Sequence, residues 1–194
     1  MTPALFVLSL LGFVLMFALP VIFFRGDGKK HLRWWLTGAP FGLAVLGIVL
    51  AWAEASPRLA SGTGVLATVL DIAGMLVTVG AIALIAATIA IHRVPLALWH
   101  QDDDRNAPVH IVTYGPYAWV RHPFYVAFIL LLAGAASIAR DPITLVALPL
   151  GLFVLDWTAR TEEKKLLASE LGDEYGAYRD RTGRFVPRLE SAWR

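Results

Sequence analysis

The sequence contains no cysteine, and only 16% of its 194 residues are charged. The absence of cysteine excludes disulfide bonds, thiolate metal sites and cysteine nucleophiles. Apolar residues make up 57% of the chain, and its mean hydropathy is +0.62. A water-soluble fold of this length could not bury so much apolar surface, whereas a lipid bilayer does not require that burial. The composition therefore predicts an integral membrane protein.

A large excess of basic residues is also missing, because the net charge is only +2. No nucleic-acid partner is therefore expected. The histidines do not indicate a metal site either, since no two of four neighbouring ones would occupy adjacent turns of a helix. These four are His92, His100, His110 and His122. Three consecutive acids, Asp102 to Asp104, do not converge in any regular structure and are interpreted as a solvated loop.

Five apolar stretches are candidates for membrane-spanning helices, each of which needs roughly 20 residues. They are Thr2–Phe24, Trp34–Ala53, Gly64–Ile91, Pro123–Ala139 and Pro142–Leu155. Only Arg140 and Asp141 separate the last two, and Asp-Pro is a turn and helix-start signal, so we expect a helical hairpin. The first stretch is too long for a signal core and has no preceding base, which favours a retained helix.

The predicted fold class is therefore all-α, with about five transmembrane helices and a cytoplasmic helical tail at the carboxy terminus. Residues 1–194 form one membrane domain in this interpretation. Residues 1–91 would supply the amino-terminal transmembrane helices, and residues 92–194 would hold the functional core. Neither internal repeats nor low-complexity linkers interrupt this arrangement.

The distribution of basic residues predicts the orientation in the membrane. Fifteen of the 17 lie in the first loop, the third loop and the tail, while Arg58 and Arg140 are alone in the other two loops. The fifteen share one side if the amino terminus is outside and the carboxy terminus is cytoplasmic. We accordingly predict a multi-pass protein of a bacterial inner membrane, with its polar chemistry on the cytoplasmic side.

The densest polar cluster runs from Tyr114 to Tyr125 and includes Arg121 and His122 immediately before Pro123. Proline suits the first turn of a helix, where its missing N–H is not needed. Arg121 and His122 would then lie at a helix N-terminus, which favours anions such as carboxylate or phosphate. The alternative is an interfacial anchor, because arginine, histidine, tyrosine and tryptophan collect at the headgroup level.

A second cluster follows the last apolar stretch. Asp156, Arg160 and Glu163 are spaced i, i+4, i+7, so a continuing helix places them on one face. A face carrying both signs at the membrane boundary suits a zwitterionic ligand, but a salt-bridged helix end is an equally open interpretation. Asp71 is the one acid well inside an apolar stretch. It lies near the outer end of its helix, where we expect it to reach water rather than to serve a function.

Two segments resemble a known family. The run HIVTYGPYAWVRHPFY, from His110 to Tyr125, resembles the signature of the isoprenylcysteine carboxyl methyltransferase and phospholipid methyltransferase superfamily. That signature is a His-x-Leu-Val stretch, then Gly-x-Tyr, then Arg-His-Pro-x-Tyr. The tail is similar to the same family's carboxy-terminal half, through Glu162-Glu163, Gly172-Asp173-Glu174-Tyr175 and Arg184-Phe185-Val186-Pro187. The family's first histidine aligns with Val109, with His110 one place later.

The resemblance implies a cytoplasm-facing site for S-adenosylmethionine, formed by the loop before the hairpin and the helix after it. The positions that match the family's cofactor-binding residues are His110, Ile111, Val112, Tyr117, His122, Pro123, Tyr125 and Glu163. Glu163 would hold the cofactor's ammonium group, and His122 with nearby backbone donors would take its carboxylate. Arg160 lies close to a family arginine that faces the acceptor, and Arg160 and Arg121 are the candidate catalytic residues.

The activity implied is methyl transfer to a membrane-associated acceptor, either a lipid or a prenylated, lipid-like molecule. Direct displacement from a sulfonium requires mainly alignment and desolvation of the reactants. An amine or hydroxyl acceptor would also need a general base, for which Glu162, Glu163 or His122 are available. The alternatives are an NADPH-dependent sterol or lipid reductase, since some share an Arg-His-Pro-x-Tyr stretch, and a non-enzymatic membrane protein that has kept the fold.

Overall fold

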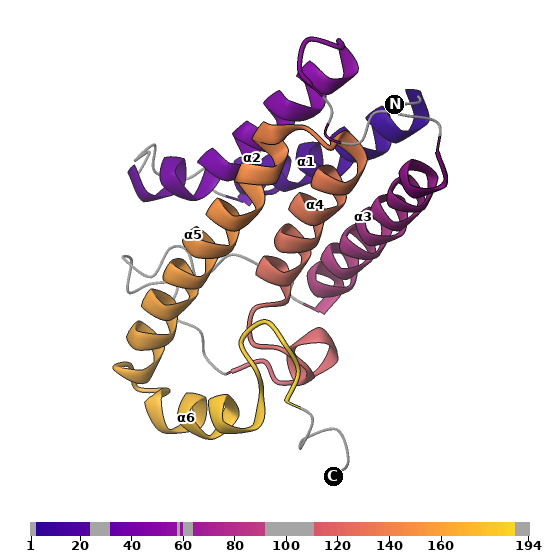
Figure 1. The fold of residues 1–194 in the computed structure, drawn as a ribbon. Coiled ribbons are helices and arrows are strands. Elements are labelled where there is room, and N and C mark those ends of the chain that lie inside the picture. Colours follow the sequence, from indigo (N-terminus) through magenta and orange to yellow (C-terminus); the bar gives the residue numbers. More distant parts are fainter. Residues whose placement is uncertain (1–2, 24–31, 58, 60–63, 92–110, 189–194) are drawn as a thin grey trace. The chain divides into compact units, whose positions relative to one another are not determined.

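The computed structural model describes residues 3–23, 32–57, 59, 64–91 and 111–188, with side chains omitted at 14–23 and 32–37. Within these residues the chain is all-helical, as predicted, and contains no strand. The helices are α1 (Pro3–Phe23), α2 (Leu32–Trp52), α3 (Val65–Ile91), the short 3-10 helix η3 (Gly115–Ala118), α4 (Pro123–Ala139), α5 (Pro142–Leu167) and α6 (Gly172–Arg181). Figure 1 shows their order along the chain.

The five longest helices coincide with the five predicted apolar stretches. By length and composition, α3 and α5 can each cross a membrane, with mean hydropathies of 2.4 and 1.6 in their most apolar windows. The described apolar parts of the other three are shorter: Pro3–Phe13, Gly38–Trp52 and Pro123–Ala139. The number of spans and their orientation remain predictions. α5 continues twelve residues beyond the predicted span end at Leu155, which confirms the continuing helix expected for the second polar cluster.

Contacts divide the chain into two compact units. The first, here the apolar unit, comprises Met1–Ala83 and Ala127–Leu155. The second, here the polar unit, comprises Leu84–Val126 and Asp156–Arg194. Each unit is thus assembled from two separate stretches of the sequence, and the polar unit contains both of the polar clusters found in the sequence.

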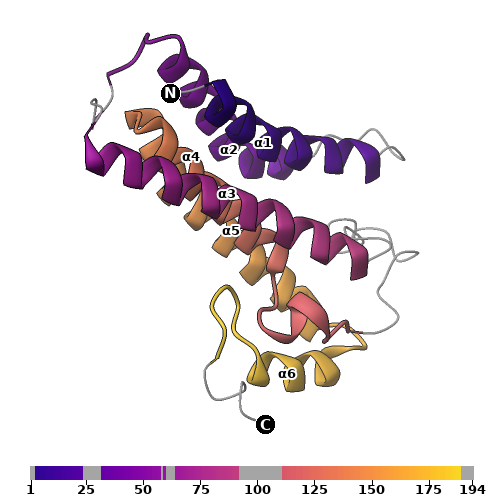
Figure 2. The same cartoon turned by 90° about the vertical axis from the view of Figure 1, so that its right-hand side faces the viewer.

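In the apolar unit, α1 and α2 lie side by side (Figure 2), and aromatic side chains join them. The rings of Phe6 and Trp52 stack with centroids 4.7 Å apart, and those of Phe13 and Phe41 meet at 6.4 Å. α3 and α4 approach closely at Gly74 and Gly134. A Cβ built on Gly74 would be 3.0 Å from the carbonyl oxygen of Gly134, so the contact depends on small residues.

The predicted hairpin is present, and its turn is well determined by local chemistry. Arg140 ends α4 with a positive φ of 51°, and Pro142 begins α5. Asp141 is fully buried and caps α5, because its Oδ1 accepts hydrogen bonds from the backbone N–H groups of Ile143 (2.7 Å) and Thr144 (3.4 Å). The hydroxyl of Ser56 donates to the other carboxylate oxygen. Asp141 therefore ties the α2–α3 connection to the start of α5.

Asp71 has a partner that was not foreseen from the sequence. Arg140 Nη1 lies 2.6 Å from Asp71 Oδ1 and also donates to the carbonyl oxygens of Ala67 and Ser137. The Arg140 side chain is buried and that of Asp71 is 30% exposed. The ion pair joins α3 to the hairpin turn, which gives Asp71 a structural role.

Candidate functional site

The polar unit brings together two segments that are about 60 residues apart in the sequence. Val120 and Gly183 form a parallel bridge. The N–H of Arg121 donates to the carbonyl of Gly183 (2.9 Å), and the N–H of His122 donates to the carbonyl of Arg184 (3.3 Å). The sequence suggested that backbone N–H groups near His122 would bind a ligand carboxylate. The N–H groups of Arg121 and His122 instead donate to carbonyl oxygens of the protein.

Glycine is required on both segments of this bridge. Gly115 has a φ of +62°, and a Cβ there would overlap the side chain of Ile91. A Cβ at Gly183 would overlap the carbonyl oxygen of Val186. Gly115 therefore permits close packing of the η3 turn against Ile91 of α3, and Gly183 permits the close approach of Val186 after α6.

The carboxylate of Glu163 is the centre of the cluster. Its Oε1 accepts from Arg121 Nε and Arg184 Nε, both at 3.0 Å, and lies 3.3 Å from His122 Nε2. Its Oε2 accepts from Arg184 Nη2 at 2.7 Å. The side chain is only 6% exposed. Buried carboxylates require such compensation, and Glu163 receives it from two guanidinium groups and one imidazole.

His122 lies between two glutamates. Its Nε2 faces Glu163, while its Nδ1 is 3.6 Å from Oε2 of Glu162. The ring stacks on Tyr125 with centroids 5.2 Å apart, and Phe185 meets it edge-on. Burial lowers the pKa of His122 and outweighs the opposing effect of Glu163, so the imidazole is neutral near pH 7. A neutral ring donates from one nitrogen and accepts at the other.

Glu162 forms a second buried carboxylate beside the first. Tyr125 donates its hydroxyl hydrogen to Glu162 Oε1 at 2.6 Å. Both groups are nearly excluded from solvent, with 9% of Glu162 and 4% of Tyr125 exposed. The predicted site residues His122, Tyr125 and Glu163 are therefore in one cluster, and Pro123 begins α4 as predicted.

The predicted face of α5 is present, with a further partner. Arg160 Nε and Asp156 Oδ2 are 2.6 Å apart, which confirms the expected i, i+4 pair. Arg184 Nη1 binds the other oxygen of Asp156 at 2.8 Å, so Arg184 bridges Asp156 and Glu163. Hydrogen bonding to Glu163 raises the pKa of Arg184 further above its ordinary value. Arg160 itself is 60% exposed and lies at the rim of the cluster.

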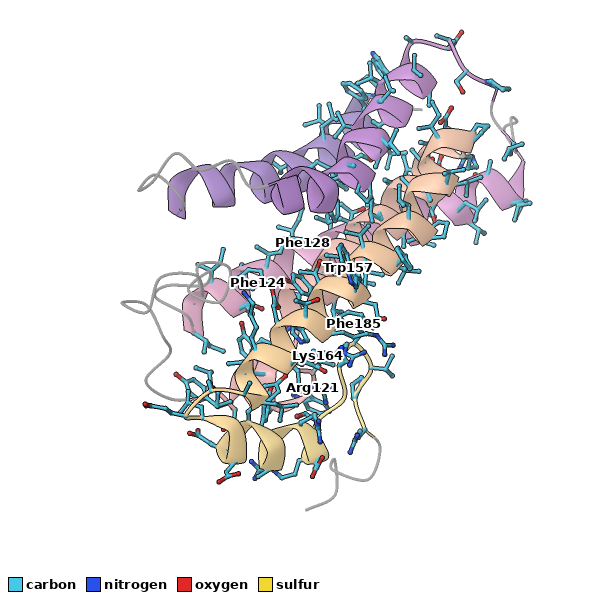
Figure 3. The ribbon with its side chains drawn as sticks, turned by 90° about the vertical axis from the view of Figure 1, so that its left-hand side faces the viewer. Arg121, Phe124, Phe128, Trp157, Lys164 and Phe185 are labelled. Atoms are coloured by element: carbon cyan, nitrogen blue, oxygen red, sulfur yellow. The ribbon has the colours of Figure 1, made fainter. Side chains whose placement is uncertain are left out.

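Arg121 is less exposed than a free catalytic cation would be. Its side chain is 7% exposed, and its Nη1 donates to the carbonyl oxygens of Arg179 (3.1 Å) and Thr182. Arg121 thus connects Glu163 to the last turn of α6. Figure 3 shows Arg121 and Phe185, from the two bridged segments, beside the carboxy-terminal half of α5.

The sequence left two interpretations of the cluster at Tyr114–Tyr125 open, an anion site and an interfacial anchor, and the burial of its residues differs accordingly. Tyr114 and Trp119 are 58% and 60% exposed, whereas Arg121 and His122 are buried. Exposed aromatic residues suit an interfacial anchor. The buried pair belongs to the charged cluster, so one short segment combines both kinds of surface.

Three tyrosines line the neighbouring part of the polar unit. The hydroxyl of Tyr178 donates to the carbonyl of Tyr117 at 2.7 Å, which attaches α6 to η3. Burial raises the pKa of Tyr178 to about 12. Tyr175 and Tyr178 pack with Leu166, and the partly buried side chains of Ile111 and Leu167 cover them. The tail motif in the sequence includes Tyr175, but the sequence alone indicated no role for it.

The remaining predicted residues lie at the edge of this region or outside the described part of the chain. The N–H of Ile111 donates to Glu174 Oε1 at 3.1 Å, and Val112 follows it. His110 falls outside the described residues, as do His92 and His100. Within the described residues, no group of three or more histidine, aspartate or glutamate side chains is arranged to hold a metal ion.

Comparison with known proteins finds a family match that includes residues of both units. Residues 105–168 match the model of the isoprenylcysteine carboxyl methyltransferase (ICMT) family. This stretch of the chain is therefore similar to the ICMT family. This segment includes Arg121, His122, Tyr125, Glu162 and Glu163, and so contains most of the buried cluster. The resemblance seen in the sequence is confirmed.

Similar proteins include two with a methyltransferase name and one named for metal resistance. A protein-S-isoprenylcysteine O-methyltransferase of Tribolium castaneum is 31% identical over 80 residues, which are 41% of this chain and 28% of the relative. An enzyme of the same name from Schizosaccharomyces pombe is 32% identical over 85 residues, covering 44% of this chain and 36% of the relative. A cobalt-zinc-cadmium resistance protein, CzcN of Cupriavidus metallidurans, is 31% identical over 124 residues, covering 61% and 55%. The chain therefore spans about half or less of these relatives' length.

Proposed function

We propose that this chain is an S-adenosylmethionine-dependent methyltransferase that acts on a membrane-associated acceptor, either a lipid or a prenylcysteine-like carboxylate. The observation that carries the proposal is the buried cluster around Glu163, within an ICMT-family segment. Charged groups are rarely buried together without a ligand or partner to justify the cost of their desolvation. This cluster has both signs of charge in one place, as a zwitterionic ligand requires.

The residues present fit the amino-acid part of this cofactor. Arg121 and Arg184 supply guanidinium donors for a carboxylate, and Glu162 and Glu163 supply acceptors for an ammonium group. Glu163 is already bound by Arg121, Arg184 and His122, so taking an ammonium group requires it to exchange or share a partner. S-adenosylmethionine supplies a methyl group on a positively charged sulfur, which needs no further activation.

The contribution of the protein to such a reaction is placement and exclusion of water. His122, stacked on Tyr125, and Arg184, bound to both Asp156 and Glu163, are held in fixed positions before any ligand enters. Preorganised groups of this kind lower the entropic cost of aligning two reactants. Exposed Arg160 is then the group that would attract an anionic acceptor at the rim of the cluster, next to Trp157, which is 48% exposed.

The nature of the acceptor decides whether a base is needed. A carboxylate acceptor attacks the methyl group directly, whereas an amine or hydroxyl must lose a proton. Neutral His122 is suited to accept that proton, because its depressed pKa keeps one ring nitrogen without hydrogen near pH 7. Glu162 is the alternative base.

Ligand titration tests the proposal directly. The purified protein in detergent or nanodiscs is titrated with S-adenosylmethionine, with S-adenosylhomocysteine and with NADPH. Saturable binding of the first two and none of NADPH supports the methyltransferase. Binding of NADPH alone would identify a reductase, and binding of none would identify a membrane protein without either activity. Mass spectrometry of lipids and peptides from cells with and without the gene then searches for the methylated acceptor.

A further inference from the structure

Tyr175 is a buried side chain with an unused polar group. It belongs to α6 and is only 3% exposed, yet its hydroxyl has no hydrogen-bond partner among the described residues. Tyr178 stands one turn later on the same helix, is equally buried, and donates to the carbonyl of Tyr117. Tyr125 donates to Glu162. Buried hydroxyls in native proteins are almost always paired, so the exception at Tyr175 requires an explanation.

The surroundings of the Tyr175 ring are mostly apolar. Leu166 and Tyr178 pack against it, and Ile111 and Leu167 cover this small core. The ring of Tyr178 meets that of Tyr175 edge-on at 6.0 Å. A ligand group that entered here would be uncharged and flat or amphipathic, because none of these packed side chains is charged.

The hydroxyl is nonetheless close enough to the charged cluster to respond to it. The charges of Glu163, Arg121 and Glu162 all act on the phenol, although burial is the main reason why its pKa is raised. The phenol therefore remains protonated at neutral pH and can donate a hydrogen bond to an incoming acceptor.

We propose that Tyr175 is a cofactor-binding residue whose hydroxyl donates a hydrogen bond to the nucleoside part of S-adenosylmethionine, at a ribose oxygen or an adenine ring nitrogen. This rests on the proposed function. The cluster around Glu163 receives the amino-acid part, and the core of Leu166, Tyr175 and Tyr178 receives the nucleoside. Tyr175 thus extends the site from the signature before α4 to α6 in the tail.

The test removes a single oxygen and compares two ligands. Tyr175→Phe keeps the ring and deletes the hydroxyl. We expect its Kd for S-adenosylhomocysteine and for 5′-methylthioadenosine, which lacks the amino-acid part, to rise by the same factor of about three to ten, equivalent to about 0.7–1.4 kcal/mol. Glu163→Gln should weaken only the binding of S-adenosylhomocysteine. If Tyr175→Phe weakens the binding of both ligands equally and Glu163→Gln weakens only that of S-adenosylhomocysteine, Tyr175 is assigned to the nucleoside part.

Thermal unfolding without ligand provides the second measurement. Tyr175→Phe should leave the Tm unchanged or raise it, because the hydroxyl has no partner to lose among the described residues. The matched control is Tyr178→Phe, on the same helix and equally buried, which loses its bond to Tyr117 and should lower the Tm by about 2–4 °C. A lowered Tm for Tyr175→Phe with unchanged Kd values would show that the hydroxyl binds an ordered water or the protein, and would overturn the proposal.

The outcomes also separate this inference from the proposed function. If the wild-type protein binds S-adenosylhomocysteine and Tyr175→Phe binds both ligands as tightly, only the role of Tyr175 is wrong. If the wild-type protein binds neither ligand, the methyltransferase proposal and the role of Tyr175 are both wrong.

Discussion

At the scale of single residues, Glu163 shows both the reach and the limit of sequence reasoning. The spacing of Asp156, Arg160 and Glu163 predicted one face of a helix, because helical period is a local property. The convergence of Arg121 and Arg184 on Glu163 joins residues 42 and 21 positions away, which no periodicity encodes. The tail motif in the sequence includes Arg184, but nothing in that motif indicates that Arg184 bridges Asp156 and Glu163.

Replacing Glu163 should affect binding and stability together. Glu163→Gln leaves Arg121 and Arg184 without their buried counter-charge, and breaking a buried charge pair costs roughly 2–5 kcal/mol. We expect S-adenosylmethionine affinity to fall at least tenfold by calorimetry and the Tm to fall as well. Glu170→Gln is the control, because Glu170 is exposed at the end of α5. Unchanged affinity in Glu163→Gln would remove this residue from the site.

His122 should make stability depend on pH. Burial lowers its pKa in the folded protein below the ordinary value of 6.5. Below pH 6.5 the unfolded chain therefore binds a proton that the folded protein does not, and stability decreases as the pH falls. The Tm of the wild type should drop more between pH 7 and 5 than that of His122→Gln, because all other titrating groups are common to both. A parallel decline of the two Tm curves would contradict a buried neutral imidazole.

At the scale of elements, apolar runs and turn residues were sufficient to predict every long helix. Five apolar stretches became α1 to α5, and Asp141-Pro142 produced the hairpin turn. The extent of α5 beyond Leu155 followed from its polar face. What the sequence could not reveal is which turn residues contact distant elements. Ser56 reaches Asp141 and Asp71 reaches Arg140 only because helices that are far apart in the sequence pack together.

The cap at Asp141 should be essential for the hairpin. Asp141→Ala removes two hydrogen bonds to the first turn of α5 and the bond from Ser56. Loss of a helix cap costs about 0.5–2 kcal/mol, and the partly buried Ser56 hydroxyl also loses its acceptor. Asp141→Asn, which keeps an acceptor oxygen, should lose clearly less Tm than Asp141→Ala. Equal Tm values for Asp141→Ala and the wild type would show that Pro142 alone is sufficient to begin the helix.

At the scale of the whole molecule, the apolar helices agree with a membrane protein, and the charged cluster around Glu163 lies in the polar unit. That unit is built from Leu84–Val126 and Asp156–Arg194, so neither part of the sequence forms it alone. Composition predicted the membrane environment, and charge bias predicted that the first loop, the third loop and the tail share one side. No sequence pattern predicts that each unit is built from two separate stretches of the chain, because that depends on contacts between segments far apart in the sequence.

Orientation follows from the charge bias and can be tested on intact cells. Fifteen of the 17 basic residues lie in the first loop, the third loop and the tail. Of the two exceptions, Arg140 is paired with Asp71, so its charge is compensated. Positive loops remain cytoplasmic. A protease added outside the inner membrane should therefore spare a cleavable tag placed after Arg194 and cut the same tag inserted beside Arg58. Cleavage of the carboxy-terminal tag together with protection of the one at Arg58 would mean that the protein is inserted the other way round, and that the charged cluster around Glu163 faces away from the cytoplasm.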